Sequence, residues 1–251
     1  FKIPLTNMLG GVGMSYFNVA YDLYYPLYAL FVSGVPVAVS KLVSESMARG
    51  LARDARRMLR ISASLFVGIG LCGSVMMVLG AGWFAQVVHN PDAKYAVWML
   101  APALFFGCIT ASFRGYFQGL QDMKPTAVSQ IVEAVAKLVL GLSLAYLITR
   151  AGLRQFERQG MVFGIACQSL EEAKLEVLPF AAAGAILGVT ISALCGGIYL
   201  YVHHKLGRGG IPPALWKAAP KAVSARILTR RLLAIAVPVC FASVFTNMTS
   251  F

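Results

Sequence analysis

Polar side chains recur at helical spacing along one apolar stretch of the chain, residues 125–149. They lie at positions i, i+4, i+7 and i+11, so a helix would place all of them on one face: Thr126, Gln130, Glu133 and Lys137. A carboxylate and an ammonium four residues apart can form an ion pair, which lowers the cost of holding both charges among apolar side chains. Two interpretations stay open: a neutralised pair that supports helix packing, or the wall of a polar cavity that contacts a charged substrate or senses protonation.

Two further polar positions could extend such a cavity. Asp22 lies near the start of an apolar stretch, and Asn18 precedes it by one helical turn. The alternative is a solvated acid within an aromatic belt at the membrane interface, formed by Tyr21, Tyr24, Tyr25 and Tyr28. Arg114 closes the apolar run 95–113, where it is either a cavity residue or a charge that marks the end of a span.

Enzyme signatures are absent from the sequence. His89, His203 and His204 lack an HExxH context, and there is no P-loop or GxSxG motif. The five cysteines show neither paired nor metal-type spacing. The sequence therefore predicts a protein that is not an enzyme, with no catalytic residue, metal site or cofactor.

The polar residues must be positioned by membrane-spanning helices. A hydrocarbon core about 30 Å thick needs about 20 helical residues, and the apolar runs are continuous rather than alternating, which excludes a β-barrel. With 58% hydrophobic and 13% charged residues, the chain is far from the composition of a soluble domain. We expect an all-α polytopic transmembrane helix bundle with spans near 16–41, 61–88, 95–117, 125–149, 178–203 and 229–251.

The net charge of +12 reports orientation rather than nucleic-acid binding. Fifteen Lys and Arg residues fall in the gaps 41–60, 114–124 and 203–231, against five in the alternate gaps 89–94 and 150–176. This positive-inside bias places the first set in the cytoplasm, beside anionic lipid headgroups. We therefore expect a multi-pass protein of the bacterial cytoplasmic membrane whose partners include membrane lipids and no nucleic acid.

Small residues and prolines within the spans indicate close helix packing. Gly184 and Gly188 form a GxxxG pattern that lets helix backbones approach, either in a static interface or in one that moves. The chain starts at Phe1 without Met and stops at Phe251 inside an apolar run, so we expect a fragment with its first and last helices cut. The expected domains are a first bundle (1–203), a cytoplasmic basic linker (204–228) and the first helix of a second bundle (229–251).

One stretch of the sequence indicates a particular protein family more specifically than the helical periodicity does. It combines Arg114-Gly-Tyr-Phe-Gln118-Gly119, a short polar turn, Pro125-Thr126, and Ser129-Gln130 through Glu133. Together with Ile3–Asn7, Tyr25–Tyr28 and the segment GVPVAVSK at 34–41, it resembles the polysaccharide-flippase branch of the MATE-like (MOP) superfamily, closest to the stage V sporulation protein B group. The segment 150–177 is longer and more charged than this resemblance leads us to expect.

The resemblance implies two six-helix bundles around a central cavity, which move lipid-linked sugar precursors across the membrane by alternating access. Residues 1–203 would then be most of the first bundle, and the activity would need the missing C-terminal bundle. Arg114, Gln118, Gln130 and Lys137 would line the cavity and suit the diphosphate and sugar hydroxyls of a lipid-linked oligosaccharide. Glu133 would hold Lys137 or bind a coupling ion, H⁺ or Na⁺.

Three other functions remain open at this stage. A cation-coupled drug exporter of the same superfamily would show acidic cavity residues, whereas this chain offers a balanced Glu133 and Lys137 stripe. A membrane assembly factor for spore or envelope biogenesis would show no substrate-dependent conformational change. A membrane-embedded glycosyltransferase would need a pair of catalytic acids.

Overall fold

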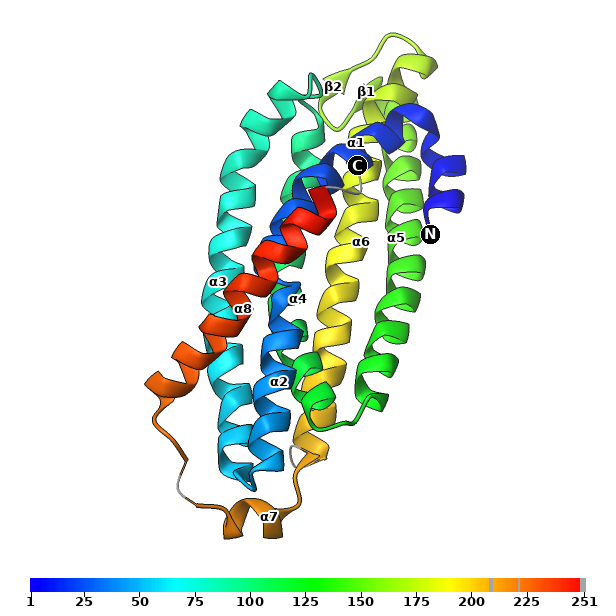
Figure 1. The fold of residues 1–251 in the computed structure, drawn as a ribbon. Coiled ribbons are helices and arrows are strands. Elements are labelled where there is room, and N and C mark those ends of the chain that lie inside the picture. The colour runs from blue at the N-terminus through cyan, green and yellow to red at the C-terminus, as the bar shows by residue number, and fades with distance from the viewer. Residues whose placement is uncertain (208–209, 221, 249–251) are drawn as a thin grey trace. The chain divides into compact units, whose positions relative to one another are not determined.

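Long helices make up almost all of the protein. The computed structural model describes residues 1–207, 210–220 and 222–248, without the side chains of 213, 216 and 244–248. In this part of the chain the helices are α1 (Lys2–Phe31), α2 (Gly34–Ala48), α3 (Ala52–Val87), α4 (Ala93–Gly119), α5 (Lys124–Gln159), α6 (Leu170–Leu206), α7 (Pro213–Ala218) and α8 (Ala225–Met248) (Figure 1). The strands β1 (Met161–Val162) and β2 (Ile165–Ala166) form one short antiparallel hairpin.

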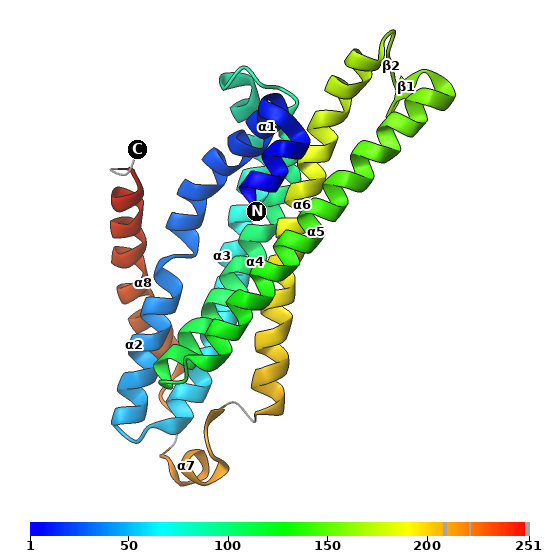
Figure 2. The same cartoon turned by 90° about the vertical axis from the view of Figure 1, so that its right-hand side faces the viewer.

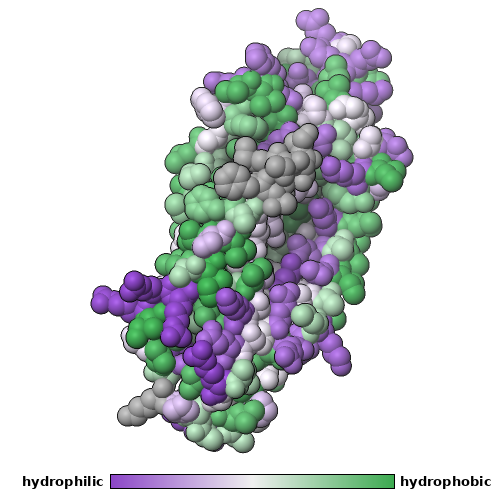
Figure 3. All heavy atoms as spheres, viewed as in Figure 1, coloured by the Kyte–Doolittle hydropathy of each residue, from purple (hydrophilic) through white to green (hydrophobic). Residues whose placement is uncertain are grey.

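The predicted all-α polytopic architecture is confirmed. Five stretches in the described residues are long and apolar enough to cross a membrane, and they run over 2–48, 52–87, 93–119, 124–159 and 170–206. The sixth predicted span, 229–251, corresponds to α8 as far as Met248, and residues 249–251 lie outside the described part. Exposed apolar side chains such as Leu79 and Trp83 on α3 and Phe241 on α8 suit contact with lipid. Figure 3 shows hydrophilic residues where α8 begins and mainly apolar residues over its middle.

The chain divides into two compact units, and the long helices contribute to both. Unit 1 comprises Phe1–Tyr24, Val75–Ala103 and Ala134–Ser192. Unit 2 comprises Tyr25–Ser74, Leu104–Glu133 and Ala193–Phe251. This division differs from the expected domains, which stay a prediction.

The predicted span 16–41 is interrupted in the structure. Helix α1 ends at Phe31 and α2 begins at Gly34 (Figure 2). The Ser33 hydroxyl donates to the carbonyl of Ala29, 2.6 Å away, and thereby satisfies one backbone acceptor near the break. A Cβ atom at Gly34 would lie 2.6 Å from Sγ of Cys240, so the absence of a side chain here lets α8 pack against α2.

Unit 2 also holds the connection between α6 and α8 against the start of α3. The buried Asp54 carboxylate accepts the backbone N–H of Val223 at 2.8 Å, and Arg57 donates to the Val223 carbonyl at 3.1 Å. Arg53 donates to the carbonyl of Lys217 at 2.8 Å. The predicted linker 204–228 is therefore fixed to α3 at two points, while residues 208, 209 and 221 lie outside the described part.

In unit 1 the segment between α5 and α6 is more ordered than a long loop. Helix α5 continues ten residues past the predicted span end at Thr149, and the turn of the hairpin uses positive φ angles at Phe163 (47°) and Gly164 (94°). The Phe163 ring lies 4.9 Å from that of Phe180 on α6. Burial and the carboxylates of Glu172 and Glu176 raise the pKa of the Cys167 thiol, so this thiol stays protonated at neutral pH.

The predicted close approach at the GxxxG pattern of α6 is confirmed within unit 1. A Cβ atom at Gly188 would overlap the backbone of Gly141 on α5, and one at Gly184 would overlap the side chain of Ile148. Helix backbones can touch in this way only where side chains are absent, and the gain is tight van der Waals packing without polar groups.

Gly188→Leu is expected to lower the free energy of unfolding by about 1–3 kcal/mol or to prevent folding, because the new side chain forces α5 and α6 apart. The measurement is thermal unfolding of the purified chain in detergent. Gly80→Leu is the matched control, since a Cβ atom there meets nothing within 4 Å. Equal effects of the two substitutions would contradict the close contact.

Candidate functional site

An ion pair between neighbouring helices forms the centre of the candidate site in unit 2. The Arg114 guanidinium of α4 contacts the Glu133 carboxylate of α5 at 2.6 Å, and the two side chains are only 16% and 33% exposed. Nε of Arg114 also donates to the Ser129 hydroxyl at 3.2 Å, and that hydroxyl donates to the carbonyl of Thr126 at 2.7 Å. A charge-assisted network thus ties the end of α4 to the start of α5.

Residues 114–119 present different helix faces to different neighbours, and these contacts fix the position of Arg114. A Cβ atom at Gly115 would lie 2.7 Å from the carbonyl oxygen of Pro36, and one at Gly119 would lie 2.8 Å from that of Ser40. Helix α4 therefore packs backbone to backbone on α2 along these two glycines. Arg114 and Gln118, one turn apart, remain partly buried beside this glycine face.

The aromatic pair of the same motif anchors α4 against α6. Tyr116 and Phe117 are buried, and their rings lie 5.5 and 5.4 Å from the rings of His204 and His203, respectively. Closer to the ion pair, a Cβ atom at Gly196 of α6 would lie 3.3 Å from Oε2 of Glu133. Three helices of unit 2 thus meet around the carboxylate, which limits how far Glu133 can move.

The remaining predicted residues of unit 2 differ in exposure. Gln118 is partly buried and Gln130 is exposed. Thr126 is buried, and its hydroxyl has no hydrogen-bond partner among the described residues. A buried hydroxyl without a partner is costly, so this group is available to a polar ligand or a water molecule.

In unit 1, Lys137 lies among aromatic rings. Its ammonium nitrogen is 5.4 Å from the ring centre of Phe1 and 5.6 Å from that of Tyr21, within range of cation–π attraction. Asn18 and Asp22, which flank Tyr21 along α1, are both exposed. The structure thus groups Arg114, Glu133 and the Thr126 backbone in unit 2, whereas a common cavity for all eight predicted residues stays a prediction.

Two features of the site were missed from the sequence. The sequence did not predict the contact between Arg114 and Glu133, since spacing along α5 suggested Lys137 as a partner, and Ser129 was not chosen as a site residue. A signal did exist. Arg114 lies five residues before the end of α4, and Glu133 lies nine residues after the start of α5. An antiparallel hairpin therefore leaves a difference in depth of about 6 Å, which a long arginine side chain can bridge.

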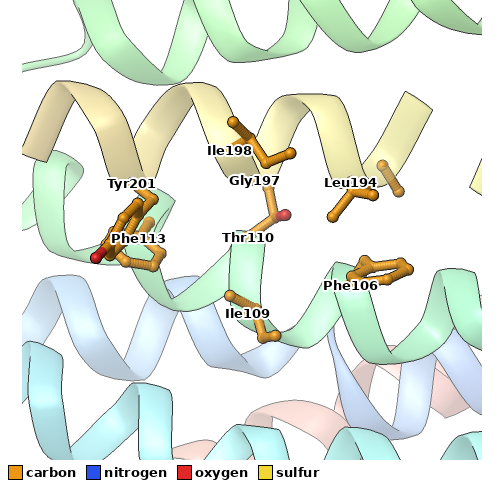
Figure 4. Close-up of a pocket in the computed structure, with 9 residues that line it drawn as sticks. Phe106, Ile109, Thr110, Phe113, Leu194, Gly197, Ile198 and Tyr201 are labelled. Carbon is orange, nitrogen blue, oxygen red and sulfur yellow. The ribbon is translucent and has the colours of Figure 1, made fainter. Parts of the chain in front are cut away.

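A second feature of unit 2 is an apolar slot between α4 and α6. It has a volume of about 200 Å³, and aromatic rings form much of its wall: Phe106, Phe113 and Tyr201 (Figure 4). Gly197 leaves room above the buried Thr110, whose hydroxyl has no hydrogen-bond partner among the described residues. The slot suits an apolar chain. Elsewhere in the described part, no group of three or more His, Cys, Asp or Glu side chains could hold a metal ion.

The sequence matches a known family over much of its length. Residues 1–157, more than half of the chain, match the family described as "Polysaccharide biosynthesis protein". The chain belongs to this family, and it is a multi-pass bacterial membrane protein. The resemblance to the polysaccharide-flippase branch is thereby confirmed.

Among individual proteins, the chain is 31% identical over 159 residues to the lipid II flippase MurJ of Bacillus subtilis. The matched stretch covers 60% of this chain and 29% of that protein. It is 27% identical over 205 residues to the stage V sporulation protein B of the same organism, covering 81% of this chain and 35% of the relative. The chain therefore spans about a third of the length of the curated relatives it matches. No solved structure matches it.

Glu133→Gln is expected to lower the free energy of unfolding by about 1–3 kcal/mol, because it leaves the Arg114 guanidinium partly buried without its counter-charge. The matched control is Glu45→Gln, which breaks the exposed 2.8 Å pair between Glu45 and Arg49 and should cost at most about 0.5 kcal/mol. Thermal unfolding in detergent measures both.

The double variant Arg114→Glu with Glu133→Arg restores opposite charges and should recover part of the lost stability. A double-mutant cycle then gives the coupling energy of the pair. A coupling energy of zero between the two positions would show that the ion pair does not stabilise the protein.

Proposed function

We propose that the whole protein is a flippase for lipid-linked oligosaccharide or peptidoglycan precursors and performs no covalent chemistry. The observation that carries this proposal is the hydrogen-bonded Arg114–Glu133 pair between apolar, membrane-capable helices of a polysaccharide biosynthesis family member. A relative at 31% identity is named a lipid II flippase, which supports the same function here.

The chemistry of such a substrate suits the polar side chains of this chain. A lipid-linked sugar has an anionic diphosphate, a hydrated sugar and an apolar tail. The Arg114 guanidinium has five N–H donors, and its two hydrogen bonds to Glu133 and Ser129 leave donors for a phosphate oxygen. Lys137 offers a second cation, and Gln118, Gln130 and Asn18 offer amides to the sugar hydroxyls.

The apolar part of the substrate has a separate place in this proposal. The slot between α4 and α6 is lined almost entirely by apolar groups, and Ile198 and Tyr201 at its wall are exposed. A chain of isoprenyl or acyl type loses contact with water and gains dispersion contacts there. The diphosphate and sugar would move along the polar side chains of the protein, while the apolar tail remains in or beside the lipid.

The proposal also includes coupling of transport to an ion and a second helix bundle. Glu133 would release Arg114 when it binds H⁺ or Na⁺, and the freed guanidinium would then bind a phosphate. Residues 1–203 would form most of a first bundle, with 229–251 opening a second that completes the transport path. A cation-coupled drug exporter is disfavoured, because Arg114 and Lys137 add positive charge that repels a cationic drug.

Lys137→Gln in the whole protein is expected to reduce flipping by about tenfold or more, because a charge-assisted contact to the diphosphate is lost. The readout is the appearance of lipid-linked precursor on the outer leaflet of cells or vesicles. Lys137→Arg should retain most of the activity, since it keeps the charge.

Lys94→Gln is the matched control for this substitution. Lys94 also lies over an aromatic ring, 5.0 Å from that of Tyr95, but in a different helix. Unchanged flipping after Lys137→Gln, with normal amounts of protein in the membrane, would rule out Lys137 as a substrate contact.

A further inference from the structure

A hollow in unit 1 has features that neither helix packing nor the proposed transport route uses. It measures about 540 Å³ and lies between the first part of α1 and the last turns of α5. Its lining combines the apolar side chains of Met8, Tyr146 and Leu153 with the charged side chains of Arg150, Arg154 and Glu157. The hollow therefore offers contacts to hydrocarbon and cationic donors to an anion.

The two arginines are placed to act together. Arg150 and Arg154 lie four residues apart, so they occupy successive turns on one face of α5. Both side chains are exposed, and neither forms an ion pair or hydrogen bond with any residue that the structure describes. Their planar donor forks are thus open to a ligand, and this geometry matches phosphate oxygens.

The position of the hollow along α5 indicates a membrane surface. The apolar stretch 125–149 ends just before Arg150, and α5 continues as a helix to Gln159. Along this face Tyr146 precedes Arg150 by one turn, and Leu153 lies between Arg150 and Arg154, so apolar and cationic groups alternate where the apolar stretch ends. The acyl region and headgroup of a lipid meet at such a boundary. Tyr146 is typical of this boundary, because its ring is apolar and its hydroxyl is polar.

The charges on this side of the chain also need an explanation of their own. The positive-inside bias predicts that 150–176 lies opposite the strongly basic gaps, where basic residues are not needed for orientation. Arg150 and Arg154 nevertheless lie there on one face, and both line the hollow.

We propose that this hollow binds the phosphate of a membrane lipid headgroup, with Arg150 and Arg154 as the phosphate ligands and Met8, Tyr146 and Leu153 against the glycerol and first acyl carbons. The Glu157 carboxylate at the same site disfavours a small dianion such as free phosphate. It favours a phosphodiester headgroup that carries a hydroxyl or ammonium donor. This proposal depends neither on the Arg114–Glu133 pair nor on the proposed flipping.

The test is lipid binding by the purified full chain in detergent, measured by native mass spectrometry and by the lipid-induced rise in unfolding temperature. The probes are phosphatidylglycerol, phosphatidylethanolamine, diacylglycerol without phosphate, and inorganic phosphate. The wild type is expected to bind both phospholipids and to bind diacylglycerol and inorganic phosphate at least about tenfold more weakly. The double variant R150Q/R154Q should bind the phospholipids about tenfold more weakly than the wild type.

Arg158→Gln is the matched control. Arg158 lies on the same helix and is exposed, but it does not line the hollow. An equal loss in this control would mean that surface charge alone attracts lipid, and phospholipid binding by R150Q/R154Q at the wild-type level would also overturn the proposal. Equal binding of inorganic phosphate would identify a free-anion site instead of a lipid site. Unfolding temperatures without lipid show that each variant is folded.

Discussion

A guanidinium among membrane-capable helices must have a counter-charge close by, and unit 2 is organised around this requirement. Removing an ion from water costs several kcal/mol, and only a nearby opposite charge with good hydrogen-bond geometry offsets the loss. Glu133 meets this need for Arg114 at 2.6 Å, and Ser129 occupies a further donor. The depth of α4 relative to α5 is therefore set by electrostatics as well as by the short turn between them.

Glycine contacts provide the second part of this organisation. Gly115 and Gly119 bring α4 onto the backbone of α2, and Gly196 lets α6 approach the Glu133 carboxylate. An added side chain at Gly115 or Gly119 would separate α4 from α2, and a Cβ atom at Gly196 would press on the Glu133 carboxylate. The residues that hold the charged groups in place are thus the smallest ones, and they carry no functional group themselves.

Part of the fold could be predicted from the sequence, because lipid strongly restricts the conformations that a backbone can adopt. Long apolar runs have to be helices, so the spans and the Gly184–Gly188 contact were predictable. The break at Val32–Ser33 was not, because an apolar run looks the same whether or not a helix is interrupted within it. The partner of Glu133 was missed because spacing along a helix finds neighbours on that helix, while the pair with Arg114 forms across a turn.

The fixed connection before α8 determines how that helix can respond to the rest of unit 2. Because Asp54 and Arg57 bind the backbone of Val223, only Ser224 separates the last anchored residue from the first turn of α8. A connection of one residue allows little independent movement, so a tilt of α3 also changes the position of the start of α8. Along the chain, a change that starts in α6 meets this anchor on α3 before it reaches α8.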